Sequence, residues 1–158
     1  HQADFVAHVD ELIKLTGINP SRLKLELTES MVLIDVADTV VKMHALKKLG
    51  VRFSMDDFGT GYSSLSYLTQ LPLDQLKVDQ SFVRNIGIKP TDAVIVQTII
   101  GMANNLNMEA IAEGVETQAQ RDFLEKAGCM RYQGYLFGKP EPLEKFTDSI
   151  LNMGMHEA

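Results

Sequence analysis

Apolar residues recur along the chain in two patterns, one typical of helices and one typical of strands. Apolar residues repeat at helical spacing from Phe5 to Leu15 and stop at Gly17, and a second such repeat over 40–49 stops at Gly50. The run over 23–28 alternates apolar and polar residues and predicts a strand, and further short strands are expected over 51–55, 75–78, 110–112 and 132–137. Further helices are expected over 64–71, 91–106, 118–127 and 143–153.

The order of these elements predicts an α/β fold with a parallel sheet. Strand and helix alternate five times, at about 20 to 40 residues per unit, which is typical of βα units. The helix over 91–106 is strongly apolar, and we expect it to bury one stripe. The predicted stripe consists of Val94, Ile95, Ile99, Met102 and Leu106. A chain of 158 residues corresponds to one domain.

Composition excludes some classes of partner and site. The formal net charge of -6 argues against a surface that binds polymeric nucleic acid, but not against a small nucleotide. Cys129 is the one cysteine, so we expect a buried thiol and no intramolecular disulfide. The longest apolar stretch, 93–103, is too short to span a bilayer, and no signal peptide is visible. We expect a cytoplasmic location, with membrane attachment of a parent protein left open.

Polar side chains stand at or just after the end of every predicted strand. They are Glu26 and Glu29 at the first strand, Asp56 and Asp57 at the second, Lys77 and Asp79 at the third, Glu113 and Glu116 at the fourth, and Gln133 at the fifth. Catalytic and ligand-binding groups of parallel α/β folds collect at the carboxyl ends of the strands. We therefore predict one shared site, against the alternative of separate surface charges and helix caps.

The stretch from Asp56 to Leu65 carries two adjacent carboxylates into a turn with two glycines. Neighbouring side chains of a strand point to opposite faces, so both aspartates serve one site only if the strand ends between them. Gly59 and Gly61 permit the positive φ angles that such an exit requires. An ordinary helix entry is the alternative.

The spacing of the other acids predicts which of them face the site and which of them hold a loop. Glu26 is expected to face inward, while Glu29 holds the Gly59–Gly61 loop. In the same way, Glu113 is expected to face inward and Glu116 to hold a loop.

Lys77 and Asp79 are two residues apart, so on a strand they share a face and can form an ion pair. This pair would keep the lysine charged and directed into the site. An ordinary salt bridge is the alternative.

The ligand atoms at the predicted site are all oxygen. None of the four histidines falls at a strand end, which argues against a tetrahedral zinc site. Clustered carboxylates select Mg²⁺ or Mn²⁺. The adjacent Asp56 and Asp57 indicate two metals about 4 Å apart, an arrangement that promotes attack on a phosphodiester.

The motifs resemble those of the EAL-type cyclic-di-GMP phosphodiesterases of bacterial signalling. The matching segments are Glu26-Leu27-Thr28-Glu29-Ser30, Asp56-Asp57-Phe58-Gly59-Thr60-Gly61-Tyr62-Ser63-Ser64, Lys77-Val78-Asp79, Ala112-Glu113-Gly114-Val115-Glu116-Thr117 and Gln133-Gly134-Tyr135. The resemblance implies a modified TIM barrel that binds cyclic di-GMP with Mg²⁺ or Mn²⁺ and hydrolyses it to linear pGpG. It also implies dimerisation and a sensor or cyclase domain upstream in the parent protein.

The resemblance assigns roles to the residues at the site. By position, Glu26 and Asp56 resemble ligands of the first metal, and Asp57 resembles a ligand of the second, which Asp56 bridges. Lys77 would orient the attacking water or stabilise charge on the phosphate. Glu113 resembles a general base or metal-linked ligand.

Three further roles are implied. Gln133 would support the metal-bound water. Glu29 would anchor the Asp57–Ser64 loop, and Glu116 is expected to anchor a loop in the same way.

The chain departs from the family pattern at its beginning. The Glu-Ala-Leu metal-ligand strand is absent, and Glu109-Ala110-Ile111 stands at the start of its strand, the wrong end of the barrel. A barrel of about 250 residues would need about 90 more, so we expect 1–158 to be an N-terminally truncated domain with about five of the eight βα units. The unpaired sheet edges predict that the chain either self-associates or is poorly soluble, and the missing metal ligands predict little or no hydrolysis.

Three functional hypotheses follow. The first is an enzyme domain that hydrolyses cyclic di-GMP. The second is a degenerate module that binds cyclic di-GMP or recruits a partner without cutting. The third is a phosphate-binding α/β scaffold, in which Asp57→Asn would leave metal affinity unchanged.

Overall fold

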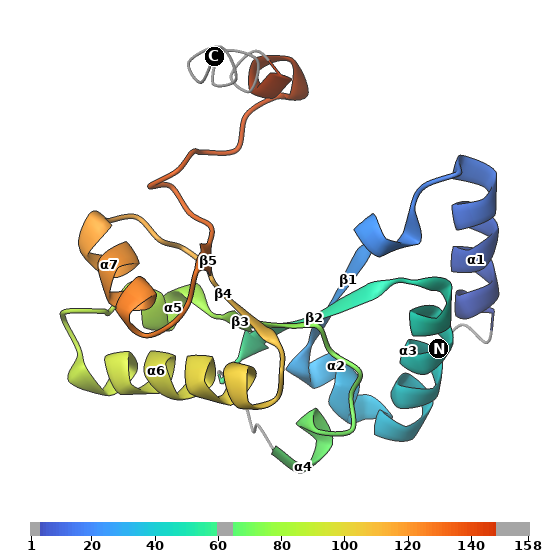
Figure 1. Ribbon diagram of the computed structural model, residues 1–158, viewed down its shortest axis with the longest axis horizontal. Helices are drawn as coiled ribbons and strands as arrows, with labels where there is room; N and C mark the ends of the chain where they lie inside the picture. The colour runs from blue at the N-terminus through green and yellow to red at the C-terminus, as the bar shows by residue number, and fades with distance from the viewer. Residues whose placement is uncertain (1–3, 60–64, 148–158) are drawn as a thin grey trace.

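Five parallel strands form one sheet in the order β1-β2-β3-β4-β5, with helices between them (Figure 1). The computed structural model describes residues 4–59 and 65–147. The strands are β1 (Lys24–Thr28), β2 (Arg52–Phe58), β3 (Gln75–Val78), β4 (Glu109–Ala112) and β5 (Arg131–Tyr132). The helices are α1 (Phe5–Thr16), the 3-10 helix η1 (Pro20–Arg22), α2 (Glu29–Ile34), α3 (Val36–Leu49), α4 (Leu65–Leu68), α5 (Gln80–Val83), α6 (Pro90–Asn105) and α7 (Gln118–Lys126). The predicted α/β fold with a parallel sheet is confirmed.

The two faces of the sheet differ because side chains alternate along each strand. Phe53 and Met55 of β2 and Leu76 and Val78 of β3 are buried in the core. Helix α6 packs on β3 and β4, and α2 packs on β1 and β2. In Figure 1, α3 lies to the right of β1 and β2, and α6 runs below β3 and β4. The opposite face carries the polar side chains described below.

Two glycines end helices where the sequence predicts. Gly17 (φ 66°) and Gly50 (φ 100°) follow α1 and α3 in the left-handed conformation, which residues with a side chain rarely adopt. Helix α3 begins at Val36 rather than at residue 40, because the Asp35 carboxylate caps it by accepting a hydrogen bond from the amide of Asp38. The short helices α2 and α5 were not predicted.

The buried stripe of α6 differs from the predicted one. The buried residues are Val96, Ile99, Ile100 and Ala103, whereas the side chain of Val94 is 60% exposed. Because nearly the whole helix is apolar, hydropathy alone does not show which side faces the sheet.

The last predicted strand is also shorter than expected. Strand β5 ends at Tyr132, because the chain turns at Gly134 and the amide of Phe137 donates to the Gly134 carbonyl. The predicted helix over 143–153 is observed over 143–147, and its remainder lies outside the described residues. Cys129 is buried as predicted, and this burial raises the pKa of its thiol. Within the described residues, no helix is both long and apolar enough to cross a membrane.

Candidate active site

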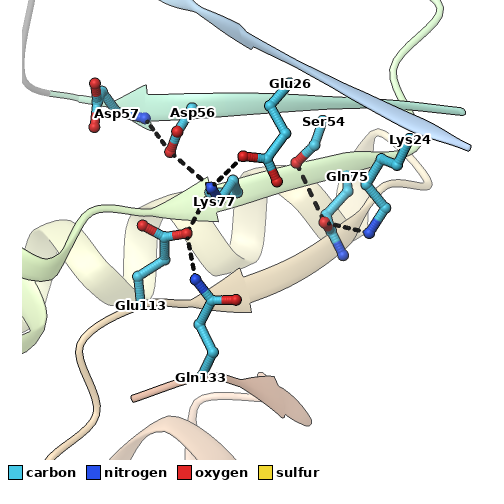
Figure 2. Close-up of polar contacts among 9 residues, drawn as sticks. All are labelled: Lys24, Glu26, Ser54, Asp56, Asp57, Gln75, Lys77, Glu113 and Gln133. Atoms are coloured by element: carbon cyan, nitrogen blue, oxygen red, sulfur yellow. Dashed lines mark hydrogen bonds and ion pairs between the residues drawn. The ribbon is translucent and has the colours of Figure 1, made fainter. Parts of the chain in front are cut away.

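The polar face of the sheet is organised in layers. Near the beginning of the strands, the Glu109 carboxylate lies 2.9 Å from the Arg131 guanidinium. In the next layer, Gln75 Oε1 accepts hydrogen bonds from Lys24 at 2.9 Å and from Ser54 at 3.2 Å (Figure 2). Glu109 therefore lies at the amino end of β4, as predicted, and outside the candidate site.

At the carboxyl end of the sheet, the ammonium of Lys77 lies among three carboxylates from three other strands or strand ends (Figure 2). Its Nζ atom lies 2.6 Å from Glu113 Oε1, 2.9 Å from Glu26 Oε2 and 3.1 Å from Asp56 Oδ1. Lys77 is only 5% exposed. Burial lowers its pKa, but hydrogen bonds to Glu113, Glu26 and Asp56 outweigh burial and hold the pKa above its usual value. Lys77 is therefore charged at neutral pH.

Asp57 leaves the regular strand through a bulge. Strand β2 continues to Phe58, so it is longer than the predicted strand over 51–55 and does not end between the two aspartates. Met55 pairs with Leu76 and Phe58 with Val78, so β2 carries an extra residue there, and Asp57 has a φ of 53°. The Asp57 amide donates to Asp56 Oδ1 at 3.0 Å, while its carboxylate points away from Lys77 (Figure 2). The bulge thus keeps both aspartates at one end of the sheet.

Partial burial is the largest influence on the Asp57 carboxyl. It raises the pKa, and the negative charges of Asp56 and Asp79 raise it further, whereas the Lys77 ammonium lowers it. The carboxyl of Glu113 shows the same balance. Burial raises its pKa, and the hydrogen bond from Lys77 opposes this rise.

Gln133 connects the fifth strand to the cluster. Its Nε2 donates to Glu113 Oε1 at 2.8 Å, the same oxygen that contacts Lys77. The amide of Gln133 donates to Ala112 at 2.9 Å, and its carbonyl accepts from Val115 at 3.1 Å. Strand β4 and the loop after it therefore fix the position of Gln133.

Glu29 is not among the three carboxylates that form ion pairs with Lys77. It is the first residue of α2 and 5% exposed. Burial raises the pKa of the Tyr67 hydroxyl, and the neighbouring Glu29 carboxylate raises it further. Residues 60–64, which include Thr60 and Gly61 of the Gly59–Gly61 loop, lie outside the described residues, so anchoring of that loop by Glu29 stays a prediction.

Asp79 does not form the predicted pair with Lys77. Strand β3 ends at Val78, and Asp79 instead caps α5 by accepting hydrogen bonds from the amide and hydroxyl of Ser81. Its influence on the site is the negative charge that it places near Asp57.

Glu116 has an exposed side chain, and its role as a loop anchor stays a prediction. The Gln120 carboxamide oxygen accepts hydrogen bonds from the amides of Glu116 at 2.8 Å and Thr117 at 3.0 Å. Sequence analysis missed Gln120, although Thr117-x-x-Gln120 is the spacing of a capping box, which the structure contains.

A cavity of about 840 Å³ adjoins Glu113 and Gln133. Its walls include Gln80, Tyr135 and Lys139, which the sequence analysis did not assign to the site. The ammonium of Lys139 lies 5.3 Å from the centre of the Tyr135 ring. Pockets of a few hundred to a thousand Å³ are typical of small-molecule ligands. The segments 112–117 and 133–135 are what marked this region in the sequence.

The oxygen donors match the chemistry of a hard divalent cation, but their arrangement is that of a lysine site. Glu26, Asp56 and Asp57 supply only carboxylate oxygens, which suit Mg²⁺ or Mn²⁺. Within residues 4–59 and 65–147, no group of three or more histidine, cysteine, aspartate or glutamate side chains is placed to hold a metal ion. Lys77 lies between Glu26 and Asp56 instead.

The chain matches known proteins along most of its length. The family model of the EAL domain matches residues 1–140. The bifunctional diguanylate cyclase/cyclic di-GMP phosphodiesterase MucR of Pseudomonas aeruginosa is 42% identical over 148 residues, which are 94% of this chain and 22% of MucR. The chain thus spans about a fifth of the length of this relative.

Solved structures share the fold. The PaMucR phosphodiesterase in a c-di-GMP complex superposes with a TM-score of 0.87 at 42% identity, over 92% of this chain and 59% of that chain. BlrP1 of Klebsiella pneumoniae in a manganese/cy-diGMP complex gives a TM-score of 0.81 at 34% identity, over 89% of this chain and 36% of that chain. Sequence, fold and the family model agree, and the chain belongs to the EAL domain family.

Proposed function

We propose that this chain is the C-terminal part of a metal-dependent phosphodiesterase domain that hydrolyses cyclic di-GMP to linear pGpG. The observation that carries the proposal is the convergence of Glu26, Asp56, Lys77, Glu113 and Gln133 in one hydrogen-bonded network at the carboxyl end of the sheet. Relatives named as cyclic di-GMP phosphodiesterases, or solved as complexes with cyclic di-GMP, support the choice of substrate.

The acids would hold the metal and the lysine would bind the phosphate. Glu26, Asp56 and Asp57 would hold Mg²⁺ or Mn²⁺, which supplies Lewis-acid stabilisation of charge on the phosphate. Lys77 stays protonated, so it donates hydrogen bonds to a phosphate oxygen and does not accept a proton from water.

In this proposal, Glu113 receives the proton of the water. It lines the cavity, and Lys77 and Gln133 both hold its Oε1 atom in position. In this scheme a water oxygen bonds to phosphorus and Glu113 takes one proton of that water. The bond from phosphorus to one ribose oxygen breaks, and the departing oxygen takes up a proton from solvent and leaves as a hydroxyl.

A non-catalytic module that binds cyclic di-GMP is the second candidate. It is favoured by the open sheet and by the occupation of the carboxylate cluster by Lys77. The same cavity beside Glu113 would then bind the dinucleotide without cutting it.

The discriminating experiment follows pGpG by chromatography while Mn²⁺ and cyclic di-GMP are titrated into this chain and into the longer protein that contains it. We expect the longer protein to form pGpG and its Glu113→Gln variant to be slower by about 10²- to 10⁴-fold. Glu125→Gln on the exposed surface of α7 is the matched control. Binding of cyclic di-GMP by the longer protein without formation of pGpG would favour the second candidate. We expect little or no hydrolysis by the 158-residue chain itself.

A further inference from the structure

Lys77 lies at the centre of the site on the middle strand of the sheet. Its ammonium has three hydrogens and contacts three carboxylates, Glu26, Asp56 and Glu113, each at 3.1 Å or less. All the N–H donors of the Lys77 ammonium therefore point at the acidic cluster of Glu26, Asp56 and Glu113.

Among the described residues, no other lysine or arginine forms an ion pair with these three carboxylates. Carboxylates held this close repel one another when no cation lies between them. Lys77 is therefore the cation that Glu26, Asp56 and Glu113 share.

The atoms that contact Lys77 are also the atoms that a metal needs. Glu26 and Asp56 each direct one oxygen at Nζ, and these are two of the residues that the proposed function assigns to the metal. A divalent cation and an ammonium bound to the same oxygens repel each other.

We propose, resting on the proposed function, that Lys77 is an internal counter-ion that holds the carboxylate cluster together in the metal-free chain and is displaced from Glu26 and Asp56 when the metal binds. The flexible four-carbon stem of lysine allows this movement. The displaced ammonium is then released toward the incoming phosphate.

The test uses Mn²⁺ alone, without nucleotide, on the chain and on Lys77→Met. Thermal unfolding in EDTA and calorimetric titration of Mn²⁺ are the two readouts. We expect Lys77→Met to unfold at a lower temperature in EDTA, because three carboxylates lose their shared cation. We expect it to bind Mn²⁺ about tenfold more tightly than the unchanged chain, because a competing charge is gone.

Lys24→Met is the matched control. Lys24 lies on the same face one layer lower and donates to Gln75 rather than to a carboxylate. It should leave Mn²⁺ affinity unchanged.

Two results would overturn the inference. One is equal stability of Lys77→Met and the unchanged chain in EDTA. The other is equal Mn²⁺ affinity of the two proteins, including undetectable binding by both. If Lys77→Met does not fold in EDTA, recovery of its far-ultraviolet circular dichroism spectrum on addition of Mn²⁺ supports the inference, and failure to recover opposes it. Because no nucleotide is present, failure here is distinct from failure to form pGpG.

Discussion

At the scale of single residues, Lys77 shows how one buried side chain orders a charged site. Its ammonium satisfies carboxylates that come from β1, β2 and the end of β4, so it joins segments far apart in the sequence. Burial opposes the charge on Lys77, but the three hydrogen bonds outweigh burial. Lys77 is therefore a cation rather than a base at neutral pH, as its proposed contact with a phosphate requires.

Among the glycines of the described residues, Gly134 leaves the least room for a Cβ atom. A Cβ atom there would lie 2.2 Å from the carbonyl oxygen of Val115, and its φ of 157° is at the limit of the left-handed region. Backbone atoms of the loop cannot move aside as a side chain does. We expect Gly134→Ala to lower the free energy of unfolding by about 3 kcal/mol, measured by urea denaturation.

Gly138→Ala is the control for this substitution, because nothing lies within 4 Å of its Cβ position. Equal stability of the two variants would show that the turn at Gly134 differs from the one described.

The reactivity of the Cys129 thiol tests whether this part of the core is closed to solvent and reagents. The thiol is buried and donates to the carbonyl of Arg131, and burial raises the pKa of the thiol above its usual value. A raised pKa means less thiolate at any given pH, and the thiolate is the reactive form. We expect Ellman's reagent at pH 8 to react slowly with the native chain, faster as the pH rises, and completely in urea. Immediate stoichiometric reaction of the native chain would contradict the burial.

At the scale of elements, strand ends decide which acids reach the site. Asp56 lies on the regular part of β2, whereas Asp57 is the extra residue of a bulge. Asp79 follows the last residue of β3 and caps α5. Sequence spacing predicts neither the bulge nor the cap, because the bulge depends on how β2 pairs with β3 and the cap depends on the hydrogen bond from Ser81 to Asp79.

The capping box of α7 supports the loop that carries Glu113. Gln120 is 8% exposed and accepts from two backbone amides at the start of the helix. We expect Gln120→Ala to lower the free energy of unfolding by about 1 to 2 kcal/mol, because both amides lose their acceptor in a partly buried place.

Gln118→Ala is the control on the same helix, since Gln118 is exposed and its side chain donates a hydrogen bond to Asp122. A loss of stability in Gln118→Ala as large as that in Gln120→Ala would argue against the role of the capping box.

At the scale of the whole molecule, the sheet has two edges. Within the described residues, β1 pairs only with β2, and β5 pairs only with β4. An edge strand offers unpaired amides and carbonyls to another chain. Next to β1, exposed apolar side chains of α2 add to this surface, with Ile34 74% exposed.

We expect the 158-residue chain to self-associate through β1. Size-exclusion chromatography with light scattering should show a species larger than 17.6 kDa, and Ile34→Lys should shift it toward the monomer. Ile88→Lys is the control, because Ile88 is similarly exposed at 72% and precedes α6. A monomer peak for the unchanged chain, or an equal effect of both lysines, would contradict pairing through β1.

The sequence was sufficient for the parallel α/β fold and for the group of residues at the strand ends, because both follow from local patterns. Apolar alternation marks strands, glycines such as Gly17 and Gly50 end helices, and parallel strands bring their carboxyl ends to one edge. Glu26, Asp56 and Glu113 could be placed near one another on that basis alone.

Tertiary structure decided how those residues pair. The three carboxylates converge on Lys77, Asp79 caps a helix instead, and Gly134 ends β5 early by passing close to Val115. These features depend on distances between segments that are distant in the sequence, and on which of several acids lies nearest to the buried ammonium. Local hydropathy contains no information about such distances, because they arise only when the strands are packed side by side.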